Sequence, residues 1–173
     1  MDTIFEIRAT LVGSTPCIYR VFWIPSSFTL TLLHETFQAL FTWENFHRHF
    51  FKNEDNTIIN KELERTLKDI FENNSKITYV YDLGNAWTLD VELVKQWDEE
   101  NEKKYPICVG GSRKSPPEDS GGIVGYQMAI ELLETNESRD VFLLYDWYGE
   151  DYNPEEFSIA EINSRLDYLR GNS

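Results

Sequence analysis

Hydrophobic and polar residues alternate at the start of the chain in the pattern of paired β-strands. Within residues 3–12 apolar side chains occupy every second position, which predicts a strand with one buried face. Residues 17–24 (CIYRVFWI) are rich in the β-branched and aromatic side chains that strands favour. The intervening residues 13–16 (GSTP) are typical of a turn. We therefore expect these two segments to form a hairpin.

A helical period then replaces the alternation. Between residues 30 and 41 apolar side chains recur every three or four positions, which predicts an amphipathic helix. Thr29 is suited to cap it, and His34 falls on its apolar face. Residues 47–52 (HRHFFK) are expected to form a short strand.

The middle of the chain predicts one more helix and a second hairpin. Asn60 is expected to cap a helix that runs to about residue 72. Residues 76–82 and 87–97 have strand composition, and residues 83–86 between them contain a Gly-Asn pair. Such a pair favours a tight hairpin turn.

A long irregular stretch and a helical segment follow. Residues 99–124 collect proline and glycine and are expected to form a loop, and a loop of this length in a compact domain is often functional. Beyond it we expect three helices, which begin near Gly125, Ser138 and Ser158. Ser158 and Glu161 match the capping-box motif at the start of the last one.

The order of these elements indicates the fold class. Strands gather early, helices gather late, and the connections between strands are hairpin-like. This order predicts an α+β fold, an antiparallel β-sheet with helices packed on it, as a single domain over residues 1–173.

Five ordered stretches of the chain resemble the motifs of one family. They are residues 16–25 (PCIYR…IP), 33–50 (LH…Q…F-x-WE…H-x-HF), 81–87 (YDLGNAW), 116–126 (PPEDSGG…GY) and 147–163 (W-x-G-x-D…PE-x-F…N). Together they resemble the plasmid pRiA4b open-reading-frame-three-like family, some members of which carry labels of mobile-element passenger or resolvase-like proteins. The resemblance implies an α+β fold and no established activity.

The chain departs from the motifs of that family at four positions. Asn85 stands where the family usually has Asp, and Leu89 stands where many members have His. Ser115 and Ser120 stand where many members have Cys. A site that required that acid, that imidazole or those thiols would be weakened in this chain.

Charge narrows the range of partners. The formal net charge is −14, and residues 1–53 are balanced with four acids and four bases, so residues 54–173 carry the whole excess. Such a field repels a phosphate backbone, which disfavours direct binding of duplex nucleic acid. The sequence contains no apolar run of transmembrane length, so no membrane association is expected. Two cysteines are too few for a disulfide framework, and a cytoplasmic location is expected.

The three histidines are the first candidate site. His47 and His49 would share one face of a strand, and His34 on the neighbouring helix could converge on them. Three imidazoles and a water suit Zn²⁺, so a divalent metal is a candidate cofactor, although no cofactor is predicted outright. The spacing matches no zinc signature, and hydrogen-bonded structural histidines are the more common finding.

Acidic and aromatic side chains form the second candidate site. Asp82 ends a strand, and Glu118 and Asp119 lie in the long loop, where they could act as acid and base or serve as turn and helix caps. Trp43 and Trp87 could line a groove beside them or belong to the core.

The sequence carries no catalytic signature, so three functional classes stay open. The favoured one is a non-enzymatic binding or interaction module with an aromatic and acidic cleft, whose partner is a protein or a small polar ligand. The second is a metal-dependent hydrolase or lyase that uses His34, His47 and His49 or the loop carboxylates. The third is an accessory protein of a plasmid or mobile element.

Overall fold

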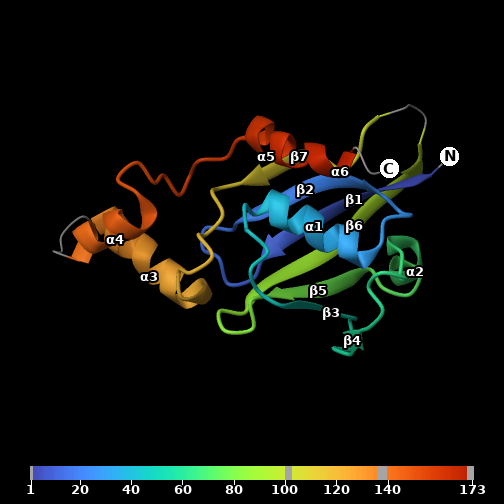
Figure 1. The fold of residues 1–173 in the computed structure, drawn as a ribbon, viewed down its shortest axis with the longest axis horizontal. Coiled ribbons are helices and arrows are strands. Elements are labelled where there is room, and N and C mark those ends of the chain that lie inside the picture. Colours follow the sequence, from blue (N-terminus) through green and yellow to red (C-terminus); the bar gives the residue numbers. More distant parts are fainter. Residues whose placement is uncertain (1, 100–102, 136–139, 171–173) are drawn as a thin grey trace.

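A curved antiparallel sheet is the frame of the molecule (Figure 1). The computed structural model describes residues 2–99, 103–135 and 140–170. Its seven strands lie in the order β4-β3-β5-β6-β1-β2-β7, and each neighbouring pair is antiparallel. The strands are β1 (Thr3–Leu11), β2 (Tyr19–Pro25), β3 (His49–Lys52), β4 (Ile58–Ile59), β5 (Lys76–Tyr81), β6 (Trp87–Asp98) and β7 (Ile107–Ser112).

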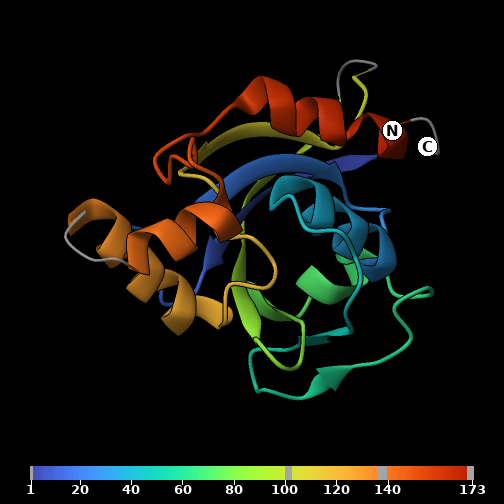
Figure 2. The same cartoon turned by 60° about the vertical axis from the view of Figure 1, so that its left-hand side comes forward.

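The sheet curls around its first helix, as Figure 2 shows. The helices are α1 (Leu30–Leu40), α2 (Leu67–Phe71), α3 (Gly122–Thr135), α4 (Asp140–Tyr148), α5 (Ile159–Arg165) and α6 (Asp167–Arg170). Leu33, Phe37 and Leu40 of α1 are fully buried against the inward-facing side chains of the strands. Because burial alternates along β1 and β2, one face of the sheet builds this core and the other stays partly exposed.

The remaining helices occupy two places (Figures 1 and 2). α3 and α4 lie side by side at one end of the sheet, and α5 lies along the edge strand β7. Asn163 of α5 binds the backbone of Cys108 in β7 twice, accepting from its N–H at 3.0 Å and donating to its carbonyl at 2.9 Å. This amide satisfies edge groups that would otherwise lack a partner. None of the helices in the described residues is both long enough and apolar enough to cross a membrane.

The main expectations from the sequence are confirmed. The fold is α+β with an antiparallel sheet, and β1 pairs with β2 as a hairpin. α1 lies within one residue of its predicted bounds, and Thr29 caps it by accepting from the N–H of Leu32. β5 and β6 form the second hairpin. In its turn the positive φ angles fall on Asp82 and Ala86, so the Gly-Asn pair is not where the backbone turns left-handed.

The long irregular stretch contains a strand that the sequence did not predict. β7 lies within residues 99–124 and pairs with β2, a partner far away in the chain. Its two consecutive glycines, Gly110 and Gly111, hide the alternating pattern of a strand. A Cβ at Gly111 would come within 2.6 Å of the Phe157 ring and 2.7 Å of the Tyr19 carbonyl oxygen, so tertiary packing explains this glycine.

Several predicted boundaries are wrong. Asn60 caps no helix, because α2 begins only at Leu67, where Thr66 and Asp69 form a reciprocal capping box. His47 lies outside β3, which begins at His49. The expected cap at Ser138 lies outside the described residues.

The helices of the C-terminal third also differ in their bounds. α3 begins at Gly122, three residues before the predicted start at Gly125. The last predicted helix is divided into α5 and α6, although its apolar stripe is buried throughout at Ile162, Leu166 and Leu169. Ser158 does cap α5, because its hydroxyl accepts from the N–H of Glu161.

The two glycines of β7 offer a matched test of this packing. Gly111→Ala is expected to destabilise the fold by about 1–3 kcal/mol, because the added methyl group must displace Phe157 or the β2 backbone. At Gly110 the nearest atom to a new Cβ is 3.7 Å away, on Val21, so Gly110→Ala should be neutral or slightly stabilising. Urea unfolding of both variants measures the difference. Equal midpoints for the two variants would contradict this reading of the strand.

Candidate functional site

Two buried indoles hold the loop between β7 and α3 (residues 113–121) against the sheet. The N–H of Trp43 donates to the carbonyl of Pro116 at 3.3 Å, and that of Trp87 donates to the carbonyl of Glu118 at 3.0 Å. Both rings are almost fully buried, and Trp43 stacks on Tyr81 at a ring separation of 5.1 Å. Buried indole N–H groups need acceptors, and the loop backbone supplies them. The two tryptophans therefore position the loop and belong to the core.

Glu118 is held at the base of this loop. One of its carboxylate oxygens, Oε1, accepts from the Tyr81 hydroxyl and, at 3.0 Å, from the backbone N–H of Glu44. Burial, and then the contact with Glu118, raise the pKa of Tyr81 above its ordinary value. The phenol therefore stays protonated at neutral pH and acts as a fixed donor.

His47 lies between two carboxylates at the rim of the same loop. Its Nε2 is 3.8 Å from Oδ2 of Asp82 and 3.8 Å from Oδ1 of Asp119. Asp82 is buried and accepts from the N–H of Gly84 at 3.0 Å and from the Asn85 amide at 2.6 Å. Burial raises the pKa of Asp82, but these hydrogen bonds outweigh it, and the net shift is downward. Asp82 therefore carries a charge and braces the β5–β6 turn.

His34 of α1 and His49 of β3 form a separate pair. Their rings are stacked with centroids 3.6 Å apart. His34 Nε2 lies 2.8 Å from Oδ1 of Asn45, and Nδ1 lies 2.8 Å from the Tyr79 hydroxyl. Since an amide oxygen only accepts, Nε2 of His34 carries the proton and Nδ1 accepts from Tyr79. His49 Nε2 lies 2.7 Å from a carboxylate oxygen of Glu62.

The structure thus divides the three histidines. His34 and His49 lie together, with both nitrogens of His34 engaged by protein groups, and His47 stands with Asp82 and Asp119. Across residues 2–99, 103–135 and 140–170, no three His, Cys, Asp or Glu side chains are grouped so that they could hold a metal ion.

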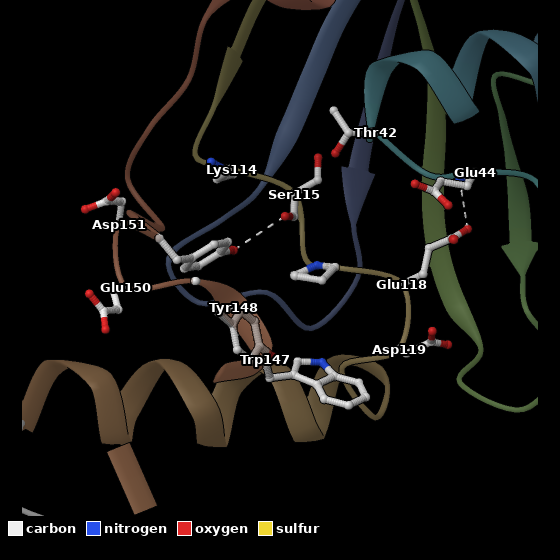
Figure 3. A pocket seen from close by; sticks show the side chains of 13 residues that line it. Thr42, Glu44, Lys114, Ser115, Glu118, Asp119, Trp147, Tyr148, Glu150 and Asp151 are labelled. Carbon is white, nitrogen blue, oxygen red and sulfur yellow. Dashed lines mark hydrogen bonds between the residues drawn. The ribbon is translucent and has the colours of Figure 1, made fainter. Parts of the chain in front are cut away.

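In front of the loop lies a cleft of about 660 Å³ (Figure 3). One wall consists of residues that follow α1 and of the loop after β7, and the other consists of the end of α4 and the residues that follow it. Five carboxylates line it, with one cation among them: Glu44, Glu118, Asp119, Glu150 and Asp151, and the cation Lys114. Lys114 is itself paired with Glu156 at 2.8 Å, so the cleft is strongly acidic.

The aromatic side of this cleft comes from residues that were not among the predicted site residues. Trp147 and Tyr148 end α4, and Tyr152 follows in the next loop. The Trp147 side chain is unusual for an indole because 60% of the residue is exposed. The signal was present in the sequence, since Trp147, Gly149 and Asp151 belong to the last family-like motif.

Comparison with known proteins settles the family. Residues 3–161 match the family described as plasmid pRiA4b ORF-3-like protein. The chain belongs to this family. It is 24% identical over 180 residues to the uncharacterized protein y4hQ of Sinorhizobium fredii (strain NBRC 101917 / NGR234), over 96% of this chain and 92% of that protein. The crystal structure of MM3350, a protein of unknown function from Methanosarcina mazei Go1, superposes with a TM-score of 0.87 at 30% identity, over 93% of this chain and 98% of that one.

Membership of the pRiA4b ORF-3-like family confirms the resemblance seen in the sequence. Neither relative's description names an activity, so the comparisons indicate no enzymatic reaction. The structure adds a location, because residues from three of the five motifs line one cleft, and Glu44 is the contribution of the motif at residues 33–50. The PPEDSGG stretch builds one wall of the cleft, and the segment from Trp147 to Asp151 builds the other.

His34 makes the stability of the fold sensitive to acid. Burial, followed by the charge of His49, lowers the pKa of His34 to about 4, below its ordinary value of 6.5. The neutral ring is thus favoured in the folded state, so its contribution is complete above pH 6.5 and is lost as the pH falls toward 4. We expect a loss of up to about 3 kcal/mol across that window.

Urea unfolding at a series of pH values measures this loss. His34→Gln should flatten the dependence between pH 6.5 and 4. His47→Gln, the same exchange at a partly exposed histidine, should keep the acid sensitivity of the wild type. An unchanged slope in His34→Gln would assign the acid sensitivity to other groups.

Proposed function

We propose that this protein is a non-enzymatic binding module whose cleft captures a cationic group of a small polar ligand or of a protein partner. The observation that carries the proposal is the lining of the cleft, where five carboxylates and an exposed indole surround a single lysine that is already paired. An anionic ligand would be repelled from such a cavity, and a cation would be attracted to it.

The walls offer two complementary ways to hold a cation. Glu118 presents a carboxylate whose position is fixed by Tyr81 and by the Glu44 backbone. Trp147 offers an aromatic face on the opposite wall, and indole is the side chain that attracts cations most strongly in this way. A fixed carboxylate facing an indole suits an ammonium or guanidinium group.

The chemistry of the lining supports binding over turnover. Neither cysteine nor histidine is among the side chains that line the described cleft. Tyr81 stays protonated, and its hydroxyl and the backbone N–H of Glu44 both donate to Glu118, so this carboxylate is held in place by the protein itself. A metal-dependent hydrolase would need a cluster of ligands, and the described residues contain none with three members.

Agmatine, which has a guanidinium and an amine but no carboxylate, is a suitable probe. Isothermal titration at low ionic strength should give saturable binding to the wild type. Trp147→Ala and Asp119→Asn should each weaken binding by roughly 3- to 30-fold, since a cation–π contact or a nearby charge contributes about 0.5–2 kcal/mol. Both side chains are exposed, so the variants should fold normally.

The matched control is Glu131→Gln, which removes one negative charge from the exposed face of α3 outside the cleft. It should bind agmatine as the wild type does. If agmatine shows no saturable binding, or if the control loses as much affinity as Asp119→Asn, the proposed capture of a cation is wrong.

A further inference from the structure

A second cavity, of about 380 Å³, adjoins the acidic cleft. The two share Thr42, Lys114 and Ser115 as part of their walls. The second cavity is closed by α5 and by residues just before it, and Arg20 of β2 reaches it from the sheet. Its character differs from that of the cleft, because its deepest charged group is a buried guanidinium.

Arg20 is a buried cation without an acidic partner among the described residues. It is 2% exposed, and the Phe41 and Phe157 rings lie 5.2 Å and 4.9 Å from its guanidinium carbon. Four of its five N–H groups are used. The acceptors are the carbonyls of Leu40 (3.0 Å), Tyr19 (2.8 Å) and Ser112 (3.0 Å) and the hydroxyl of Ser115 (2.8 Å).

The fifth N–H of Arg20, on Nη2, has no acceptor in the part of the chain that the structure describes. Most buried arginines are paired with a carboxylate, and an uncompensated buried charge is costly. Arg20 therefore has both a charge and a donor left over for a ligand.

Ser115 supplies a second donor beside it. This serine is 4% exposed, and Figure 3 shows it on the wall between Lys114 and Thr42. Its hydroxyl oxygen accepts from Nη2 of Arg20, and within the described residues its own proton reaches no acceptor. A buried donor left without a partner costs about 1–3 kcal/mol, so this pair is set up to bind something. Two adjacent donors match the two oxygens of one carboxylate.

The charges around the second cavity match a single negative charge. Three cations line it, Arg20, Lys114 and Arg165, against two carboxylates, Glu156 and Glu161. One positive charge is therefore left over, in a protein whose net charge is −14. A carboxylate would neutralise it, whereas a phosphate dianion would leave an excess negative charge beside an acidic cleft.

We propose that the second cavity binds a carboxylate through Arg20 and Ser115, and that the ligand of the protein is zwitterionic. Its carboxylate lies at Arg20 and Ser115, and its cationic group lies in the acidic cleft next door. The ligand class is therefore a free amino acid with a basic side chain or the C-terminal residue of a peptide that ends in one. The cationic half of this assignment rests on the proposed function, and the carboxylate half rests only on Arg20 and Ser115.

Arginine and argininamide test the carboxylate directly, because they have nearly the same shape and differ in that one group. Titration of the full chain should show arginine binding at least ~10-fold more tightly than argininamide, the gain of a charge-assisted pair of hydrogen bonds. Ser115→Ala should reduce that preference, because only the Arg20 donors remain for the carboxylate, and should leave the affinities for argininamide and agmatine unchanged. Ser164→Ala, at an exposed hydroxyl that lines the same cavity, is the matched control and should keep the preference.

The remaining outcomes separate the two proposals. Equal affinities for arginine and argininamide would overturn the carboxylate site and leave cation capture standing. Binding of propionate that is sensitive to Ser115→Ala, without binding of agmatine, would overturn cation capture and with it the zwitterion. Tighter binding of inorganic phosphate than of propionate would overturn the carboxylate assignment. Equal affinity for arginine and for the tripeptide Gly-Gly-Arg would identify a peptide C-terminus as the source, and binding of arginine alone would identify a free amino acid.

Discussion

The site depends on the need of two buried indoles for hydrogen-bond acceptors. Trp43 and Trp87 are packed in the aromatic core, where water cannot reach their N–H groups. They find their acceptors on the backbone of the loop at Pro116 and Glu118, and this fixes the loop against the sheet. Glu118, Asp119 and Ser115 all lie on or beside that segment, so the core determines where the polar chemistry of the surface stands.

Charge is distributed around this loop in two opposite ways. On one side the walls of the cleft bring together carboxylates from the segment after α1, the loop after β7 and the segment after α4. On the other side Arg20 is anchored by three backbone carbonyls, which accept three of its five N–H groups without cancelling its charge. Negative charge in the cleft and the positive charge of Arg20 thus lie on opposite sides of Ser115. A ligand with a positive and a negative end has one orientation in which both ends are attracted.

Local patterns predicted the fold better than the site. Alternation in β1 and β2 and the helical period of α1 depend only on neighbouring residues, and the elements that they predict are confirmed. β7 was missed because Gly111 is required by its close contact with Phe157, and no local pattern records that contact. For the same reason the sequence left open whether Trp43 and Trp87 line a groove or belong to the core, and Trp147, the exposed indole of the cleft, was not among the predicted site residues. The grouping of the histidines depends on which hydrogen bonds each ring makes, and spacing in the chain does not contain that information.

The most direct test of the account follows the backbone amides and indole N–H groups by NMR while arginine is added. The account predicts saturable shifts of the Trp147 indole signal and of the amides of residues 114–119 and 149–152, with the signals of the exposed face of the sheet unmoved. Shifts confined to that sheet face, or no saturable shifts at all, would contradict the claim that the cleft beside this loop is the binding site.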